Sequence, residues 1–231
     1  MSNSFRIRYH PRARRLKLRV HRDESLEVVA PPGTDEQSIR RFVASSGDWV
    51  EKARVRARAD RTTGPESGPF PQVLALRALG RLASVDYVDT ESRFCRWNGE
   101  GLTIGLTERE PAAAHSALVQ ALKARAVEDL EPRFRATAGR HSKRFGRLTW
   151  RNQKTRWGSC SSSGNISLNI RLLFLPPQVV DYVFAHELAH LDHPDHSPRF
   201  WNALEVMLPG AHEQRRAIRS ADQWLPEWIL R

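Results

Sequence analysis

The stretch HELAHLDHPDHS, from His186 to Ser197, restricts the fold of this chain more than any other segment. It follows PPQVVDYVFA, whose two prolines suit the first turn of a helix and whose apolar residues recur at helical spacing. We therefore expect one mostly buried helix here. On such a helix His186 and His190 are one turn apart, so both imidazoles project from one face and can bind a single ion, with Glu187 beside them.

A third ligand must come from the chain beyond this helix. If the helix continued, His193 would lie about 10 Å from His186 along the axis, at 1.5 Å per residue. Two nitrogens bound to one zinc ion at about 2.0–2.1 Å are no more than about 4 Å apart, so three histidines on a straight helix converge poorly. Pro194 disfavours helix at His193 and lets the chain reverse, which makes His196 the expected third ligand. The Ser-Pro pair that follows suits the N-cap and first turn of a second helix.

Three imidazoles and a neighbouring carboxylate describe an open metal site. A closed structural site needs a fourth protein ligand, for which Cys160, Asp192 and Asp195 are the candidates. In the open site water takes the fourth position and its pKa falls. Glu187 then removes a proton as general base, and the water attacks a carbonyl or phosphoryl centre. Zinc suits three imidazoles and water, and nickel, cobalt or manganese can bind the same ligands.

Two short segments, TRWGSCS and NISLNI, flank the polar turn SSSGN just before the predicted helix, which indicates a β-hairpin. Its exposed edge is a candidate for binding an extended peptide by strand addition, and a hairpin that only completes the core is the alternative. Arg156 is a candidate for oxyanion or phosphate binding, or for anchoring the hairpin to an acid. Trp157 suits the core, with base stacking as the alternative. We retain Arg156 and Trp157 as candidate substrate-binding residues.

The segments KTRWGSCSSSGNISLNIRLLFLPP and HELAHLDHPDHSPRFW together resemble the YgjP-like metallopeptidase family, a branch of the zincin-fold proteins. The likeness rests on TRWGSC, SLN, the LPP ahead of the helix, HExxH with a third histidine six residues beyond its end, and FW after it. It implies metal ligands at His186, His190 and His196 and a general acid/base at Glu187. The ligand spacing is similar, more loosely, to that of the Wss-type and SprT-like proteases, which act on proteins attached to DNA.

The N-terminal part predicts a β-rich region with one amphipathic helix. FRIRYH, RLKLRV and LEVVAPP alternate polar and apolar residues, which indicates a small antiparallel sheet over residues 5–30. A helix is expected from Thr34, with Gln37 completing a capping box and Trp49 on the apolar face. Three arginines on its outer face are candidates for phosphate contacts, or form an ordinary solvated face: Arg54, Arg56 and Arg58.

The rest of the chain completes an α+β protein. TTGPESGPFPQ, residues 62–72, is rich in proline, glycine and polar residues, which predicts a linker. VLALRALGRLASVDYV is typical of a hairpin, and SRFCRWN and LTIGL flank the turn residues NGEG. An Ala-rich helix is expected from Pro111, kinked or restarted at Pro132. We expect three parts: a sheet and helix at 1–61, a linker and β-hairpins at 62–110, and a zincin-like metallohydrolase domain with the HExxH helix and a small antiparallel sheet at 111–231.

The formal net charge of +11 and a pI near 10.7 favour an anionic partner such as nucleic acid or nucleotide phosphates, with general solubility as the alternative. The basic N-terminal residues lack the apolar run of a signal peptide, and no run approaches the roughly 20 apolar residues of a membrane span. Two cysteines, Cys95 and Cys160, do not make a disulfide framework. We therefore expect a cytoplasmic protein without a membrane partner.

The leading hypothesis is a zinc-dependent metallopeptidase in which Glu187 activates water to cleave a peptide or protein, in one version near nucleic acid. A second hypothesis applies the same site to a phosphoanhydride, with Arg156 and Lys154 holding a nucleotide, although the sequence has no Gly-rich phosphate loop. The third is a nucleic-acid-binding module with a structural zinc and no activity. Tyr182 and His212 are further candidates for transition-state contacts, or are structural.

Overall fold

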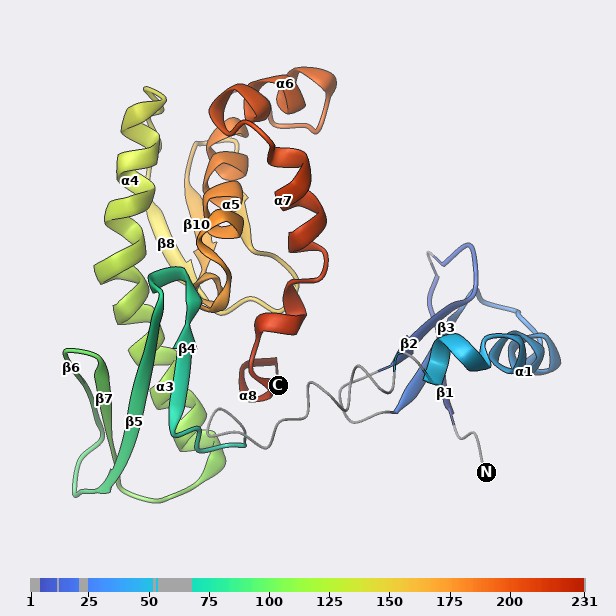
Figure 1. Cartoon of the computed structure of the whole chain (residues 1–231), viewed down its shortest axis with the longest axis horizontal. Helices are drawn as coiled ribbons and strands as arrows, with labels where there is room; N and C mark the ends of the chain where they lie inside the picture. Colours follow the sequence, from blue (N-terminus) through green and yellow to red (C-terminus); the bar gives the residue numbers. More distant parts are fainter. Residues whose placement is uncertain (1–4, 12, 21–24, 52, 54–67, 231) are drawn as a thin grey trace. The chain divides into compact units, whose positions relative to one another are not determined.

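The structure is a computed structural model, and it describes residues 5–11, 13–20, 25–51, 53 and 68–230. The chain divides into two compact units, residues 1–63 and 64–231, each with its own hydrophobic core (Figure 1). Residues 62–67 of the predicted linker and the three arginines predicted for the outer helix face lie outside the described residues.

Three strands and the helix α1 belong to the first unit. Their bounds are β1 Phe5–Tyr9, β2 Lys17–Val20, β3 Leu26–Ala30 and α1 Glu36–Ser45. The central strand is β3, in the order β1-β3-β2, because LEVVA is the most apolar of the three segments and is the most deeply buried. The pairing of β2 with β3 is antiparallel, whereas that of β1 with β3 is parallel. The expected antiparallel sheet over residues 5–30 is therefore wrong for β1, since side chains alternate in both kinds of ladder and do not report strand direction.

The start of α1 also differs from the prediction. Asp35 is the N-cap, and its carboxylate accepts a hydrogen bond from the Ser38 backbone N–H at 2.8 Å. The capping box expected from Thr34 and Gln37 is therefore wrong, because an aspartate one residue later is at least as good a cap as threonine. Trp49, expected on the apolar face, is 50% exposed, whereas the neighbouring Val50 is buried.

Two sheets and a series of helices build the second unit. The four-stranded sheet, in the order β4-β5-β7-β6, consists of β4 Val73–Leu76, β5 Arg81–Asp89, β6 Phe94–Asn98 and β7 Gly101–Leu106. The three-stranded sheet, in the order β8-β10-β9, consists of β8 Leu148–Arg151, β9 Gly158–Cys160 and β10 Ile166–Asn169. The α-helices are α3 Pro111–Arg125, α4 Glu131–Arg140, α5 Pro177–Ala189, α6 Pro198–Met207, α7 Ala211–Ile218 and α8 Glu227–Leu230. Shorter helical turns are η1 Arg77–Leu79, η2 Ala126–Leu130, η3 Ile170–Phe174 and η4 Ala221–Trp224.

Both hairpins predicted after the linker are confirmed. The strands of each hairpin, β4 with β5 and β6 with β7, are antiparallel, and β5 joins the two by pairing parallel with β7. The predicted Ala-rich helix runs through α3, the π-helical turn η2 and α4, which has Pro132 in its first turn. Proline lacks an N–H and collides with the preceding turn, and the helical ladder widens to the π-helical turn η2 directly before it. The backbone stays helical through this turn, so the helix is interrupted near Pro132 without a new start. Among the described residues no helix is long and apolar enough to cross a membrane.

The strands β9 and β10 form the hairpin predicted ahead of the HExxH helix. The sequence did not predict β8, because LTWR is too short for its alternation to be distinguished from a loop. This strand pairs parallel with β10, so the small sheet expected to be antiparallel is mixed.

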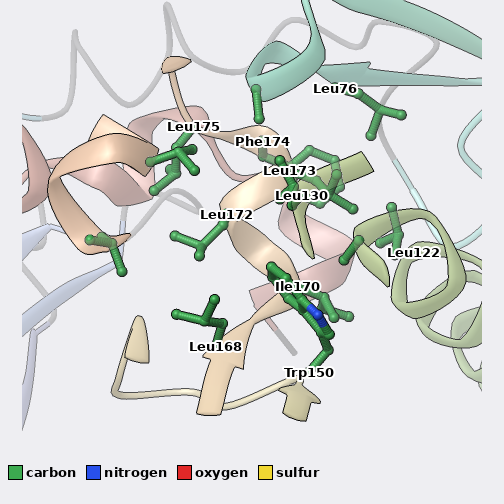
Figure 2. Close-up of a cluster of buried hydrophobic side chains, with 14 of the residues drawn as sticks. Leu76, Leu122, Leu130, Trp150, Leu168, Ile170, Leu172, Leu173, Phe174 and Leu175 are labelled. Atoms are coloured by element: carbon green, nitrogen blue, oxygen red, sulfur yellow. The ribbon is translucent and has the colours of Figure 1, made fainter. Parts of the chain in front are cut away.

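One hydrophobic core joins the hairpins at 73–106 to the helices that follow them. Its centre is the buried turn η3, and Figure 2 shows leucine and aromatic side chains from several elements converging on it: Leu76, Leu122, Leu130, Trp150 and Leu168. Against this core α5 packs a stripe of residues one turn apart, Val180, Phe184 and Leu188, each fully buried. Three helices, α4, α6 and α7, pack against α5 (Figure 1). The HExxH helix is therefore a rigid element.

A buried arginine in η3 ties the C-terminal segment to this core. Arg171 is 4% exposed, and its guanidinium donates to the Asn152 side-chain oxygen at 2.9 Å and to the Ile229 carbonyl at 2.5 Å. Both acceptors would lose a charged donor if Arg171 were removed, and an unsatisfied buried acceptor is costly.

We expect Arg171→Met to lower the free energy of unfolding by about 2–4 kcal/mol, because it leaves two acceptors without a donor. Arg93→Met changes an exposed arginine and is expected to alter it by less than about 0.5 kcal/mol. Urea unfolding followed by tryptophan fluorescence measures both. Equal stability of the two variants would contradict the role of Arg171.

Candidate metal centre

The ring nitrogens of three histidines converge at the C-terminal end of α5. His190 Nε2 and His196 Nε2 each lie 3.2 Å from His186 Nε2. One ligand nitrogen from each lies within 4.8 Å of the other two. Nitrogens bound tetrahedrally to one ion at about 2.0–2.1 Å are separated by about 3.3 Å. The donor set and its spacing therefore fit one divalent cation, and the structure brings together the three histidines that the sequence selected.

His193 takes part through its backbone and not through its ring. Its carbonyl oxygen lies 3.0 Å from His190 Nδ1. Because a carbonyl only accepts, Nδ1 carries the proton and the Nε2 lone pair of His190 is left for a cation. The His193 ring belongs to no metal-binding group among residues 68–230. The chain turns at Pro194 as expected, and His196 lies where a continued helix would not have reached.

One phenyl ring packs against all three imidazoles. The centroid of Phe200, on α6, lies 4.9, 4.5 and 4.8 Å from the centroids of His186, His190 and His196. Phe200 is fully buried and restricts the rotation of the three rings. The converging geometry is therefore held by packing, independently of a cation.

Trp201 fixes the returning segment that carries His196. Its indole N–H donates to the His196 carbonyl at 3.0 Å, and the two rings stack with centroids 5.7 Å apart. The Arg215 guanidinium carbon, on α7, lies 4.0 Å from the centre of the Trp201 ring. Residues of α6 and α7 thus hold His196 in place beside the end of α5.

The start of α6 follows the prediction from the Ser-Pro pair. Ser197 is the N-cap and Pro198 the first residue of the helix. The Ser197 side chain makes no capping bond, and the Asp195 carboxylate accepts from the Ser197 N–H at 3.3 Å instead. This turn sets the position of His196 directly before α6.

Burial and neighbouring groups keep the central histidine neutral. Burial lowers the pKa of His186 to about 3, and the nearby His190, His196 and Arg215 act in the same direction. A neutral imidazole is the form that binds a metal ion. His186 therefore offers its lone pair throughout the ordinary pH range.

The Glu187 carboxyl group lies in a shielded slot beside this cluster. Its side chain is 5% exposed, and Oε2 has no hydrogen-bond partner among the described residues. Burial raises the pKa of Glu187 to about 8, and the positive charge of Arg156 opposes that rise. An unpaired buried carboxyl group of this kind is typical of a general acid or base.

A glycine in β9 makes the room for this carboxyl group. A Cβ atom at Gly158 would lie 2.6 Å from Glu187 Oε1, 2.7 Å from its Cγ and 2.8 Å from its Cδ. These separations are far below van der Waals contact, so any side chain at position 158 would displace Glu187.

The three residues proposed as alternative fourth ligands lie outside the histidine group. In the part of the chain from 68 to 230, none of them joins the histidine group. Cys160 is half-buried, and burial together with the Glu187 charge raises the pKa of its thiol, which disfavours the thiolate. Asp192 forms an ion pair with Lys143, and Asp195 caps the turn described above. The arrangement is an open one with three protein donors.

The remaining candidate residues differ in burial and in their contacts. Arg156 is exposed and acts on Glu187 through its charge. Trp157 is partly buried and packs against the main core. Tyr182 is buried, with its ring 5.7 Å from that of His186, whereas His212 is exposed on α7. Substrate binding by Arg156 and Trp157, and transition-state contacts by Tyr182 and His212, stay predictions.

Sequence reasoning did not assign a role to the residues that support the histidines and Glu187. Gly158 and the FW pair, Phe200 and Trp201, stand out only as parts of motifs, and no sequence pattern marks Arg215. The position of FW four and five residues after the third histidine was the available signal, because that spacing brings one helical turn back over it.

Three imidazoles, an open position and an adjacent buried carboxyl group define a metal-dependent hydrolase. The chain belongs to the YgjP-like family: the model described as "YgjP-like, metallopeptidase domain" matches residues 14–221. It is therefore a metallopeptidase. A similar solved structure is that of the metallopeptidase zymogen of Pyrococcus abyssi abylysin, with 31% sequence identity over 41% of this chain and 92% of that chain and a TM-score of 0.34. No curated protein matches the chain.

We expect Gly158→Ala to reduce peptidase turnover at least about tenfold, because the added methyl group displaces the Glu187 carboxyl group. Metal affinity should change little, since the histidines lie outside that contact. Gly139→Ala is the matched control, because a Cβ there meets no atom within 4 Å. Turnover and metal titration of both variants check this, and full activity in Gly158→Ala would refute it.

Proposed function

We propose that this metallopeptidase holds one zinc ion through His186, His190 and His196 and hydrolyses peptide bonds with Glu187 as general base. The observation that carries the proposal is the convergence of three Nε2 atoms beside a buried carboxyl group. Zinc is preferred because three imidazoles at tetrahedral spacing suit it. When bound, the ion supplies Lewis acidity, which polarises the scissile carbonyl group and lowers the pKa of water.

Glu187 moves the proton in this mechanism. Its carboxylate removes a proton from the attacking water and afterwards donates it to the nitrogen of the leaving amine. The raised pKa of about 8 suits a group that must both accept and donate a proton near neutral pH. Arg156 provides a positive charge that keeps the ionised form accessible. Gly158 keeps the carboxyl group in its slot.

The free edge of β9 is the proposed place for the peptide. Trp157 accepts a backbone hydrogen bond from Asn169, and Ser161 donates one to Asn165. Since bonded pairs alternate along an antiparallel ladder, the N–H and C=O groups of Gly158 and Cys160 are directed away from β10. The strand β9 is at the edge of the sheet and packs against α5. An extended peptide paired with these groups would run past Glu187.

We expect Glu187→Gln to lower casein cleavage by about 100- to 10,000-fold, because general-base catalysis contributes about that factor. It should keep one zinc ion per chain, since the three imidazoles are unchanged. Glu213→Gln, an exposed residue on α7, serves as control and should retain activity. Cleavage assays and elemental analysis give the two readouts.

The wild-type protein and the Glu187→Gln variant also distinguish the peptidase from the two alternative functions. Phosphate release from nucleoside triphosphates with intact casein would replace the peptidase by a phosphohydrolase. Bound zinc without turnover of either substrate would favour a structural ion in a nucleic-acid-binding module.

A basic hollow in the first unit supports a nucleic acid partner. It has a volume of about 600 Å³, and no carboxylate lines it. Most of its lining side chains are cationic: Arg8, Arg14, Arg15, Lys17 and Arg19. This density of positive charge suits a phosphate backbone. We propose that the first unit binds nucleic acid and brings the peptidase to proteins near it. A cytoplasmic location stays a prediction from the sequence.

We expect Arg8→Gln/Arg19→Gln to weaken binding of a 20-nucleotide single-stranded DNA. The dependence of the logarithm of the binding constant on the logarithm of salt concentration should become shallower by about 0.7 for each phosphate that is no longer neutralised. Arg93→Gln/Lys123→Gln removes two exposed charges from the second unit and is the charge-matched control. Fluorescence anisotropy at several salt concentrations measures both. Binding that is indifferent to salt, or equally weakened by the control, would contradict this assignment.

A further inference from the structure

A second basic hollow, of about 630 Å³, lies on the solvent-facing side of the sheet β8-β10-β9. In β8 and β10 the buried residues Trp150, Ile166 and Leu168 face the core. Residues of opposite parity therefore face outward. The lining combines three exposed arginines with hydroxyl and amide groups, and no carboxylate lines it. The arginines are Arg147, Arg151 and Arg156.

The hydroxyl groups form a row across the three strands. Ser167, in the central strand, is paired with Thr149 of β8 and with Ser159 of β9. Side chains in register on one face of a sheet are neighbours, so the three hydroxyl groups lie side by side between the arginines. The lining therefore combines a row of hydroxyl groups with cationic side chains.

Several of these groups have no partner within the described chain. The Ser167 hydroxyl oxygen and Gln153 Oε1 are shielded from solvent and make no hydrogen bond to a described residue. Nor does any of the three arginines form an ion pair with a described carboxylate. Shielded polar atoms are normally satisfied, so an unmet hydroxyl donor beside unpaired arginines indicates an anionic ligand.

We infer that this hollow binds acidic side chains of the peptide substrate and makes the enzyme selective for acidic, extended segments. The inference rests on the proposed peptidase function and deepens it. The strand β9 supplies both a wall of the hollow, through Ser159, and the free edge proposed for the substrate. A peptide strand added there would lie about 4.8 Å from β9, with every second side chain on the outer face. Aspartate or glutamate at those positions would reach the hollow.

The lining and the adjoining strand edge favour a peptide over nucleic acid at this place. The residues lining the hollow include no aromatic ring on which a base could stack. The adjoining edge of β9 offers backbone N–H and C=O groups, which pair with polypeptide. Arg156 lines the hollow and acts on the Glu187 charge, so the anion site and the reacting centre are close together.

The test compares two peptides cleaved by the zinc-loaded full chain, one with glutamate at alternate positions and one with glutamine there. Wild type is expected to cleave the acidic peptide at least about tenfold better in kcat/KM. Arg147→Gln/Arg151→Gln should reduce that preference to about threefold or less and leave the glutamine peptide unaffected. Arg93→Gln/Lys123→Gln removes the same charge elsewhere and should keep the preference.

A second variant tests the row of hydroxyl groups in the hollow. Ser167→Ala removes a hydroxyl group that makes no hydrogen bond to a described residue, so thermal stability should be unchanged. The preference for the acidic peptide should fall about two- to fivefold. An unchanged preference in both this variant and the arginine pair would overturn the inference.

Binding separates this inference from the peptidase proposal. Fluorescence anisotropy measures binding of the labelled acidic peptide to Glu187→Gln protein without any turnover. The affinity should fall as the salt concentration rises. If no peptide is cleaved but binding depends on Arg147 and Arg151, the hollow is supported and the peptidase proposal fails. Equal cleavage of both peptides, or loss of single-stranded DNA affinity in the arginine pair without a change in peptide preference, overturns the acidic-peptide assignment.

Discussion

The packing of one phenyl ring against three imidazoles is the contact on which the centre depends. Phe200 brings α6 back over the end of α5, and it can do so because the chain reverses at Pro194. A helix alone presents two histidines at the right spacing and no third. The rigidity of the centre comes from burial on both sides: the apolar stripe of α5 in the core below and Phe200 beside the rings.

The Glu187 carboxyl group is a destabilising arrangement beside the histidine cluster. An unpaired acid at 5% exposure is unfavourable in the folded state, and its raised pKa reports that cost. The fold tolerates it because the surrounding core is large and because Gly158 leaves the needed space. The same strand, β9, therefore makes room for the Glu187 carboxyl group and presents the edge proposed for the peptide. Its neighbours β8 and β10 add a cationic face to that edge.

Some elements of this fold follow from local sequence, and others depend on a distant partner strand. The helix at 177–189 and the hairpin before it follow from local periodicity and turn residues, and the structure has both. The interruption of the Ala-rich helix near Pro132 follows from the chemistry of proline. In contrast, the direction of β1 and the existence of β8 are not local properties. Alternating side chains look the same in parallel and antiparallel pairs, and a four-residue strand is defined by its partner.

The sequence by itself selected the groups that converge in the structure: two histidines and a glutamate on one helix, and a third histidine after a proline. Helical spacing and the reach of a metal–nitrogen bond are enough for that choice. Only the tertiary structure decided the protonation and surroundings of those groups. His193 sets the tautomer of His190 through its carbonyl, and Gly158 shapes the slot of Glu187. Both effects depend on atoms brought together in space by packing, and sequence spacing does not encode such contacts.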